Sequence, residues 1–331
     1  MALSRILIVK LSSLGDVIHA LPVAGALRRR FPGARISWLV GPAAAGVVTI
    51  CRHVDRVLTW APGKRPRLDL LADLRRVQPQ VCLDLQGLIR TSCLAQLSGA
   101  RWRIGFHTPQ EGGFPLCNLR VIPARTDIHA VDAYLAFARF LGADRAAPDF
   151  GLDLPLQARQ MGARTATGSA GAPTVALLPG TQWESKKWPA RHFADLAFSL
   201  GRLGLRSVIL GSGADREAGA GIAAAAPSST TDLTGCTSLI ESAGIIASCA
   251  LAVGNDSGPM HLAAALGVPV IALFGPTDPV RTGPYGAGHI AIQAPVPCLR
   301  CRRRRCAVSC MERITPELVL AAVRRRLGLS A

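Results

Sequence analysis

Residues 251–279 read LAVGNDSGPMHLAAALGVPVIALFGPTDP, and this stretch decides the fold. A short apolar run over 251–253 is followed by five turn-forming residues, 254–258, and then by helix formers over 260–266. A second apolar run of strand length covers 270–274. The pattern predicts a strand, a helix and a parallel strand. Such a unit places the first turn of its helix at the carboxyl edge of the sheet, where α/β proteins bind phosphate groups.

The same alternation of apolar runs and helical spacing continues in both directions along the chain. A first series opens with a β-branched run at residues 5–11, and a second series opens at 174–178. Between them, residues 156–173 shift toward Gly, Ala, Ser and Thr, which is typical of a domain boundary. We therefore predict two Rossmann-like, doubly wound parallel-sheet domains facing one another across a cleft, with boundaries of 1–160 and 172–331.

The net charge of the chain is +17, and it is unevenly distributed. Residues 1–150 hold 20 Lys and Arg against 10 Asp and Glu, residues 298–331 hold nine against two, and residues 151–297 are neutral. Part of the excess lies in residues 99–127, which we interpret as a loop-rich basic segment. A basic excess favours anionic partners, although the arginine bias of a GC-rich genome would give the same composition. We expect no nucleic-acid partner, because there is no aromatic platform or base-reading motif.

Other features of the composition favour a cytoplasmic location. The apolar run Ile6–Val9 is broken by Lys10 and is soon followed by Asp16, which is unlike a secretory signal. No apolar run reaches the ~18 residues that a membrane span needs. Ten cysteines in such a chain are expected to be reduced thiols.

Three separated segments together resemble one family. They are KLSSLGDVIHALP at 10–22, LPGT at 178–181 with KKWP at 186–189, and NDSGPMH at 255–261 with FGPTDP at 274–279. They are similar, in the expected order, to the signatures of the ADP-heptose:lipopolysaccharide heptosyltransferases, glycosyltransferase family 9.

This resemblance implies a GT-B fold, with an acceptor-binding first domain that holds the catalytic base and a donor-binding second domain. The last helix, which begins near Thr315, could pack back on the first domain. The implied reaction moves L-glycero-D-manno-heptose from ADP-heptose to Kdo of the lipopolysaccharide inner core, with inversion and without a cofactor. Segments 84–88 and 129–131 resemble the enzyme that adds the first heptose, heptosyltransferase I, but 255–258 and the C-terminal cysteines are also common in heptosyltransferase II.

Asp16 is the predicted general base. A carboxylate in a strand-to-helix loop can accept the proton of a sugar hydroxyl. On spacing alone, Asp16 is more typical of a helix cap, and it is the family resemblance that favours the catalytic role. Beside it, Ser12, Ser13 and Gly15 allow close approach of an acceptor.

Thr181 and Lys186 are predicted to stabilise the departing ADP, because pyrophosphate charge needs a cation and hydrogen-bond donors. Outside the family, the Lys186-Lys187 pair would be interpreted as a solvated face. The resemblance also places Asp256, Ser257, Gly258 and His261 at the donor, although a histidine there is otherwise more typical of a core or a cap.

Three further groups complete the predicted site. Glu217 fits a ribose-binding carboxylate or, equally, an exposed first-turn glutamate. Arg65 and Arg120 are expected, with the arginines of 300–305, to contact the anionic Kdo-lipid A acceptor. Clustered arginines would also attract the enzyme to the anionic cytoplasmic face of the inner membrane.

Cys298, Cys301, Cys306 and Cys310 could close a tetrahedral zinc site, but we expect no metal because the interleaved arginines are unusual for one. The alternatives to a heptosyltransferase I are a heptosyltransferase II, a family 9 transferase acting on another glycan, and a nucleotide-binding module without catalysis.

Overall fold

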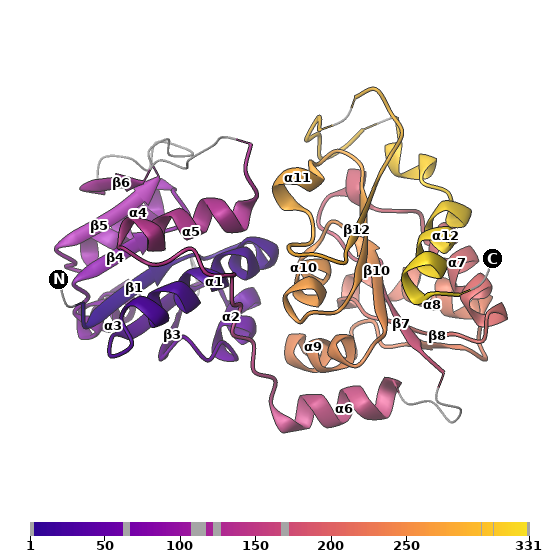
Figure 1. Cartoon of the computed structure of the whole chain (residues 1–331), viewed down its shortest axis with the longest axis horizontal. Helices are drawn as coiled ribbons and strands as arrows, with labels where there is room; N and C mark the ends of the chain where they lie inside the picture. Colours follow the sequence, from indigo (N-terminus) through magenta and orange to yellow (C-terminus); the bar gives the residue numbers. More distant parts are fainter. Residues whose placement is uncertain are drawn as a thin grey trace. The chain divides into compact units, whose positions relative to one another are not determined.

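The computed structural model describes residues 3–61, 67–106, 117–121, 127–166, 172–298, 300–306 and 308–329. The chain divides into two compact units, Met1–Asp153 and Leu154–Ala331. Figure 1 labels most of the elements of both units.

The strands of the first unit are β1 (Arg5–Val9), β2 (Arg35–Val40), β3 (Arg56–Thr59), β4 (Val81–Asp84), β5 (Trp102–Phe106) and β6 (Leu119–Val121). Its helices are α1 (Leu14–Arg30), α2 (Pro42–Thr49), α3 (Arg67–Val77), α4 (Ile89–Leu97) and α5 (Ala130–Phe140).

The strands of the second unit are β7 (Thr174–Leu178), β8 (Arg206–Ile209), β9 (Thr230–Asp232), β10 (Leu251–Asn255), β11 (Val270–Phe274) and β12 (Ile290–Gln293). Its helices are α6 (Leu156–Ala166), α7 (Ala190–Arg202), α8 (Arg216–Ala225), α9 (Leu239–Ala247), α10 (Gly258–Ala265), α11 (Pro279–Thr282) and α12 (Pro316–Leu327), with short 3₁₀ turns η1 (Glu184–Lys186), η2 (Gly213–Asp215) and η3 (Cys310–Arg313).

Both sheets are built to the same plan. Within the described residues each sheet has six parallel strands, in the order β3-β2-β1-β4-β5-β6 in the first unit and β12-β11-β10-β7-β8-β9 in the second. Counted from the first strand of each unit, both are the Rossmann order, which reverses direction between the first and fourth strands. The predicted pair of parallel-sheet α/β domains is confirmed.

The core of the second unit lies on both faces of its sheet. Alternate residues of β7 point to opposite sides, so that Val175 and Leu177 pack under α7, α8 and α12, while Ala176 and Leu178 pack under α9 and α10 (Figure 1). The last helix, α12, therefore contributes to the core of the second unit. In the first unit, α3 and α4 pack on Leu7 and Val9, and α1 lies against α2 and α5.

Two segments that we interpreted as irregular contain regular structure. The basic segment 99–127 includes β5 and β6, whose arginines and glycine hide the strand pattern. The boundary segment 156–173 includes α6, which packs closely on α9. A methyl group added at Gly162 of α6 or at Gly244 of α9 would collide with the backbone of the other helix. Small residues thus allow this close packing, and the same residues weaken the helical pattern in the sequence.

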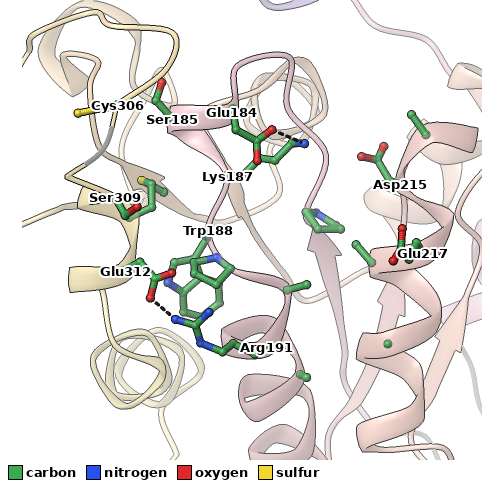
Figure 2. Close-up of a pocket in the computed structure, with 18 of the residues that line it drawn as sticks. Glu184, Ser185, Lys187, Trp188, Arg191, Asp215, Glu217, Cys306, Ser309 and Glu312 are labelled. Atoms are coloured by element: carbon green, nitrogen blue, oxygen red, sulfur yellow. Dashed lines mark hydrogen bonds and ion pairs between the residues drawn. The ribbon is translucent and has the colours of Figure 1, made fainter.

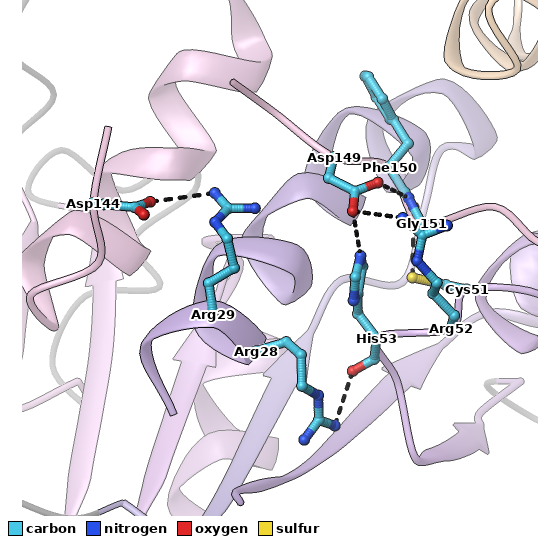
Figure 3. A network of polar contacts seen from close by, with 9 residues as sticks. All are labelled: Arg28, Arg29, Cys51, Arg52, His53, Asp144, Asp149, Phe150 and Gly151. Carbon is cyan, nitrogen blue, oxygen red and sulfur yellow. Dashed lines mark hydrogen bonds and ion pairs between the residues drawn. The ribbon is translucent and has the colours of Figure 1, made fainter. Parts of the chain in front are cut away.

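A polar network closes the first unit (Figure 3). Asp149 accepts hydrogen bonds from Arg52 Nη2 at 2.7 Å and from the Gly151 N–H at 2.9 Å, and its Oδ2 lies 2.9 Å from His53 Nε2. Arg28 Nη2 in turn donates to the His53 carbonyl at 3.3 Å. These hydrogen bonds link residues 149–151, near the end of the unit, to the loop after α2.

Candidate functional site

The carboxyl edge of the second sheet brings together two turns that are far apart in the sequence. They follow β7 and β10, the neighbouring strands at which the strand order reverses. Asn255 braces them: its Oδ1 accepts from the Trp188 N–H at 3.0 Å and its Nδ2 donates to the Pro179 carbonyl at 2.7 Å. Asn255 is fully buried, so these bonds are shielded from water. The topology therefore places Thr181, Lys186 and Asp256, three of the predicted donor residues, at a switch point, the usual ligand position in this fold.

Lys186 and Asp256 form the charged centre of this edge. Lys186 Nζ donates to Asp256 Oδ2 at 2.6 Å, and Thr277 Oγ1 donates to the same oxygen at 2.7 Å. His261 Nε2 lies 3.4 Å from the other oxygen, Oδ1. Burial alone would raise the pKa of Asp256, but the hydrogen bond and charge of His261, followed by those of Lys186, outweigh it and lower the pKa to about 2. Asp256 is therefore an anion that is neutralised by its neighbours and that fixes the turn.

Groups of the kind that attract anions lie next to this pair. Thr181 Oγ1 donates to the Asp256 carbonyl at 3.2 Å, which places Thr181 beside Lys186. Ser257 is the N-cap of α10, which begins at Gly258, and its buried hydroxyl has no hydrogen-bond partner among the described residues. The first N–H groups of a helix and the positive end of its dipole attract anions. A cation, hydroxyls and a helix N-terminus thus gather at one edge, as a diphosphate would require.

Glu217 lies apart from this group, in a pocket of about 950 Å³ (Figure 2). The pocket is also lined by Asp215, by the Glu184–Lys187 ion pair and by the Arg191–Glu312 ion pair. Thr181, Lys186, Asp256 and His261 are not among its lining residues. Pro179, however, lines the pocket and is bonded to Asn255, so the pocket adjoins the charged centre.

The corresponding edge of the first sheet holds Asp16. Its Oδ2 accepts from the Ser13 N–H at 3.0 Å and from Ser13 Oγ at 2.8 Å, so Asp16 does take part in a capping box of α1. Both bonds end on the same oxygen, and Asp16 is half-buried. The turn itself is fixed by Gln86 Oε1, which accepts from the N–H groups of Leu11 and Ser12 at 3.1 and 3.3 Å. The cap therefore uses one carboxylate oxygen and leaves the other outside its bonds.

Lys10 is a buried cation at this edge to which the sequence pattern assigned no role. Its Nζ lies 5.0 Å from the centre of the Tyr134 ring. Burial alone would lower the pKa of Lys10, but Tyr134, Asp16 and Asp84 outweigh it and raise the pKa, so Lys10 is charged. Asp84 itself accepts hydrogen bonds from Thr91, Ser92 and two backbone N–H groups.

The other predicted acceptor residues are placed only in part. Ser12 is exposed on the turn, and Gly15 is buried in the first turn of α1. Arg65 lies outside the described residues. Arg120 lies on β6, but its side chain is outside the described part of the structure.

The four C-terminal cysteines are free thiols. Burial raises the pKa of Cys310, and the nearby thiols of Cys301, Cys306 and Cys298 raise it further. Among the described residues, no group of three or more His, Cys, Asp or Glu side chains is arranged to hold a metal ion. In the same part of the chain, no helix combines the length and hydrophobicity that crossing a membrane requires.

A family model described as glycosyltransferase family 9 (heptosyltransferase) matches residues 67–312. The chain belongs to glycosyltransferase family 9. Among the relatives of this family 9 chain, lipopolysaccharide heptosyltransferase 1 of Pseudomonas aeruginosa is 32% identical over 319 residues, which cover 91% of the chain and 87% of the relative.

Solved structures support the same family assignment for this chain. The structure of E. coli ADP-heptose lps heptosyltransferase II has a TM-score of 0.79 at 26% identity and covers 98% of each chain. That of E. coli heptosyltransferase WaaC with ADP has a TM-score of 0.78 at 25% identity, covering 97% of this chain and 99% of the other. The predicted family, GT-B fold class and glycosyltransferase activity are confirmed, whereas the roles of individual residues stay predictions.

Proposed function

We propose that this family 9 transferase moves L-glycero-D-manno-heptose from ADP-heptose to Kdo of the lipopolysaccharide inner core, with inversion at the anomeric carbon. One observation carries the proposal: Thr181, Lys186 and the N-cap Ser257 converge around Asp256 at the switch point of the second sheet. The relative solved with ADP supports an adenosine diphosphate donor.

The donor half of the site would work by neutralising charge. An ammonium has three N–H donors, and Asp256 takes one of those on Lys186, so others are available to the donor diphosphate. Ser257 Oγ and the first N–H groups of α10 would supply further bonds, and Gly258 adds no side chain to obstruct them. Because negative charge grows on the departing β-phosphate, these groups stabilise the transition state.

Two other donor residues take supporting roles in this proposal. Glu217 would accept hydrogen bonds from the vicinal ribose hydroxyls, from its position in the pocket that adjoins the charged centre. His261 would act through Asp256, whose ionised state it helps to maintain. No cofactor is required, since Lys186 and the helix N-terminus supply positive charge.

The acceptor half would supply the base. Asp16 takes the proton of a Kdo hydroxyl while that oxygen forms a bond to the anomeric carbon of heptose. The bond from that carbon to ADP breaks, and ADP leaves with the electron pair. Attack from the face opposite ADP inverts the anomeric configuration. The Asp16 oxygen that is not used by the cap is the one available for this proton.

The acceptor assignment is tested by ADP release from ADP-heptose with Kdo-lipid A or with heptosyl-Kdo-lipid A. We expect release with the first acceptor only. Release with the second alone would mean a heptosyltransferase II, the activity named for one of the solved relatives. ADP binding without consumption of ADP-heptose with either acceptor would contradict both and favour another glycan acceptor or a binding module.

We further propose that the enzyme works at the cytoplasmic face of the inner membrane. The net charge of +17 and the exposed arginines of residues 302–305 support attraction to anionic lipid. Co-sedimentation with phosphatidylglycerol vesicles should be strong at low salt, weak at high salt and absent with phosphatidylcholine alone. Equal binding to both vesicle types would contradict this proposal.

A further inference from the structure

Trp183, in the turn that leads to Lys186, has two cations over its ring. Lys186 Nζ is 4.5 Å from the centre of the Trp183 ring, and Arg304 Cζ is 5.3 Å from it. Trp183 directly precedes η1 and is half-buried. An indole ring attracts cations over its face, and it does so more strongly when they are shielded from water.

The ring is one of two contacts that fix the ammonium of Lys186. Asp256 on β10 holds the ammonium through a 2.6 Å bond, and Trp183 contacts it from its own turn. The Lys186 side chain is only 15% exposed. A lysine side chain has four flexible bonds, so one ion pair leaves it several rotamers, whereas two contacts from different elements select one.

The second cation, Arg304, belongs to a segment that runs along the carboxyl edge of the second sheet. We call residues 300–306 the arginine strap. The Ser185 N–H donates to the Arg304 carbonyl at 3.2 Å, and Ser185 Oγ donates to the Arg303 carbonyl at 2.6 Å. The strap is therefore bonded to the turn that holds both Trp183 and Lys186.

The arginine strap also reaches the turn after β11. The Arg302 N–H donates to the Pro276 carbonyl at 2.9 Å, and Arg300 Nε lies 3.3 Å from Asp278 Oδ1. Between those two partners is Thr277, which donates to Asp256. The strap thus links the two turns whose side chains, Lys186 and Thr277, meet on one carboxylate oxygen.

We propose that Trp183 is a positioning residue that holds the Lys186 ammonium toward the donor diphosphate, and that the arginine strap holds Trp183 in place through Arg304. This inference rests on the proposed function, because it requires Lys186 to meet the diphosphate. It adds Trp183, which the predicted site did not include, and it gives the arginine strap a role at the donor in addition to the predicted contact with the acceptor.

The test compares four variants of the full chain by ADP affinity, measured by calorimetry, and by KM for donor and acceptor. Trp183→Leu removes the ring face, and we expect ADP binding to weaken by about 3- to 30-fold, with a matching rise in donor KM. Trp183→Phe keeps a ring and should retain most of the affinity. The acceptor KM should not change in either variant. Phe198→Leu is the matched control, because this exposed aromatic residue of α7 is not among the residues that line the pocket adjoining the charged centre.

Lys186→Met separates this inference from the proposed function. Unchanged ADP affinity in Lys186→Met would contradict the proposed donor arrangement itself. Weak binding in Lys186→Met with unchanged binding in Trp183→Leu would overturn the role of Trp183 alone. The same holds if Trp183→Phe loses as much as Trp183→Leu, because the ring would then only fill space.

A double variant gives a second, independent measure. If Trp183 acts through Lys186, then Lys186→Met with Trp183→Leu should bind ADP no more weakly than Lys186→Met alone. Additive losses would show that Trp183 contacts the ligand or supports the fold by another route. Arg304→Gln should weaken ADP binding by about 2- to 5-fold, and Arg304→Lys should restore it.

Discussion

The two sheet edges share a plan but differ in how they hold their aspartates. In each, a side-chain amide fixes the turn: Gln86 accepts from the turn after β1, and Asn255 joins the turns after β7 and β10. Asp256 is 5% exposed and is bonded to Lys186 and Thr277.

Asp16 is half-buried, and its cap bonds come from Ser13, a neutral residue. These different surroundings suit the two aspartates to different roles. A carboxylate with a pKa of about 2, as in Asp256, is a poor proton acceptor near neutral pH, but it can orient a cation. Asp16 has one oxygen outside its cap bonds, and this oxygen is the one we propose for the base.

The largest effect is expected at Asp16. Asp16→Asn keeps an oxygen that can accept from Ser13, so helix α1 should remain capped. Loss of the base should lower kcat by about 10²- to 10⁴-fold, while ADP affinity and the thermal unfolding midpoint change little. Steady-state ADP release and calorimetry measure both. Near wild-type turnover would remove Asp16 from the chemistry.

Asp256→Asn should act on stability rather than on proton transfer. The variant leaves Lys186 without its anionic partner at a largely buried position. Breaking such a pair should cost the second unit about 3 kcal/mol, the lower end of the usual range, because Lys186 keeps some contact with water. The unfolding free energy of this unit is measured by hydrogen exchange of the β7 and β10 amides at increasing urea concentration. A loss below about 1 kcal/mol, as for surface ion pairs, would mean that Asp256 is not an anchor.

The same carboxylate predicts a pH dependence. The pKa of Asp256 in the folded chain, about 2, is below its ordinary value of 3.8. Its ionisation therefore stabilises the fold fully above pH ~4, and this stability is lost as the pH falls toward 2. The difference in unfolding free energy between wild type and Asp256→Asn should shrink by about 2 kcal/mol between pH 5 and pH 2. A constant difference would contradict the lowered pKa.

The smallest effect is expected at Ser13. Ser13→Ala removes the hydroxyl that donates to Asp16, and it should cost about 1 kcal/mol of unfolding free energy in the first unit. Turnover should fall much less than in Asp16→Asn, because the carboxylate remains. An equal loss of turnover in the two variants would show that the hydroxyl, not the carboxylate, does the chemistry.

The sequence was sufficient for the architecture because buried parallel strands are continuous apolar runs. Val270–Phe274 has such a run and matches β11. The pattern fails where burial is partial or helices pack through small residues. Arg103 and Gly105 interrupt β5, and Gly162 weakens the helical spacing of α6, although this glycine is what allows α6 to approach α9.

The predicted donor residues came from the family resemblance, and three of them lie in turns after strands that the Rossmann order makes neighbours at one edge. Thr181, Lys186 and Asp256 do meet there. Glu217 lies in the adjoining pocket instead. The sequence did not predict the contact of Trp183 with Lys186 or the hydrogen bonds of Asn255 to Trp188 and Pro179. These contacts depend on side-chain directions, which residue spacing does not encode. A strand-end Asn inside the NDSG turn was the available signal.

The most direct test of the central claim is kcat at saturating ADP-heptose and Kdo-lipid A, measured side by side for Asp16→Asn and Asp256→Asn. If Asp16 is the base and Asp256 the anchor, saturating donor should bring Asp256→Asn to within about 10-fold of wild type, while Asp16→Asn stays at least about 100-fold below it. Recovery of Asp16→Asn at saturating donor, or equal losses in the two variants, would contradict the division of labour between the two edges.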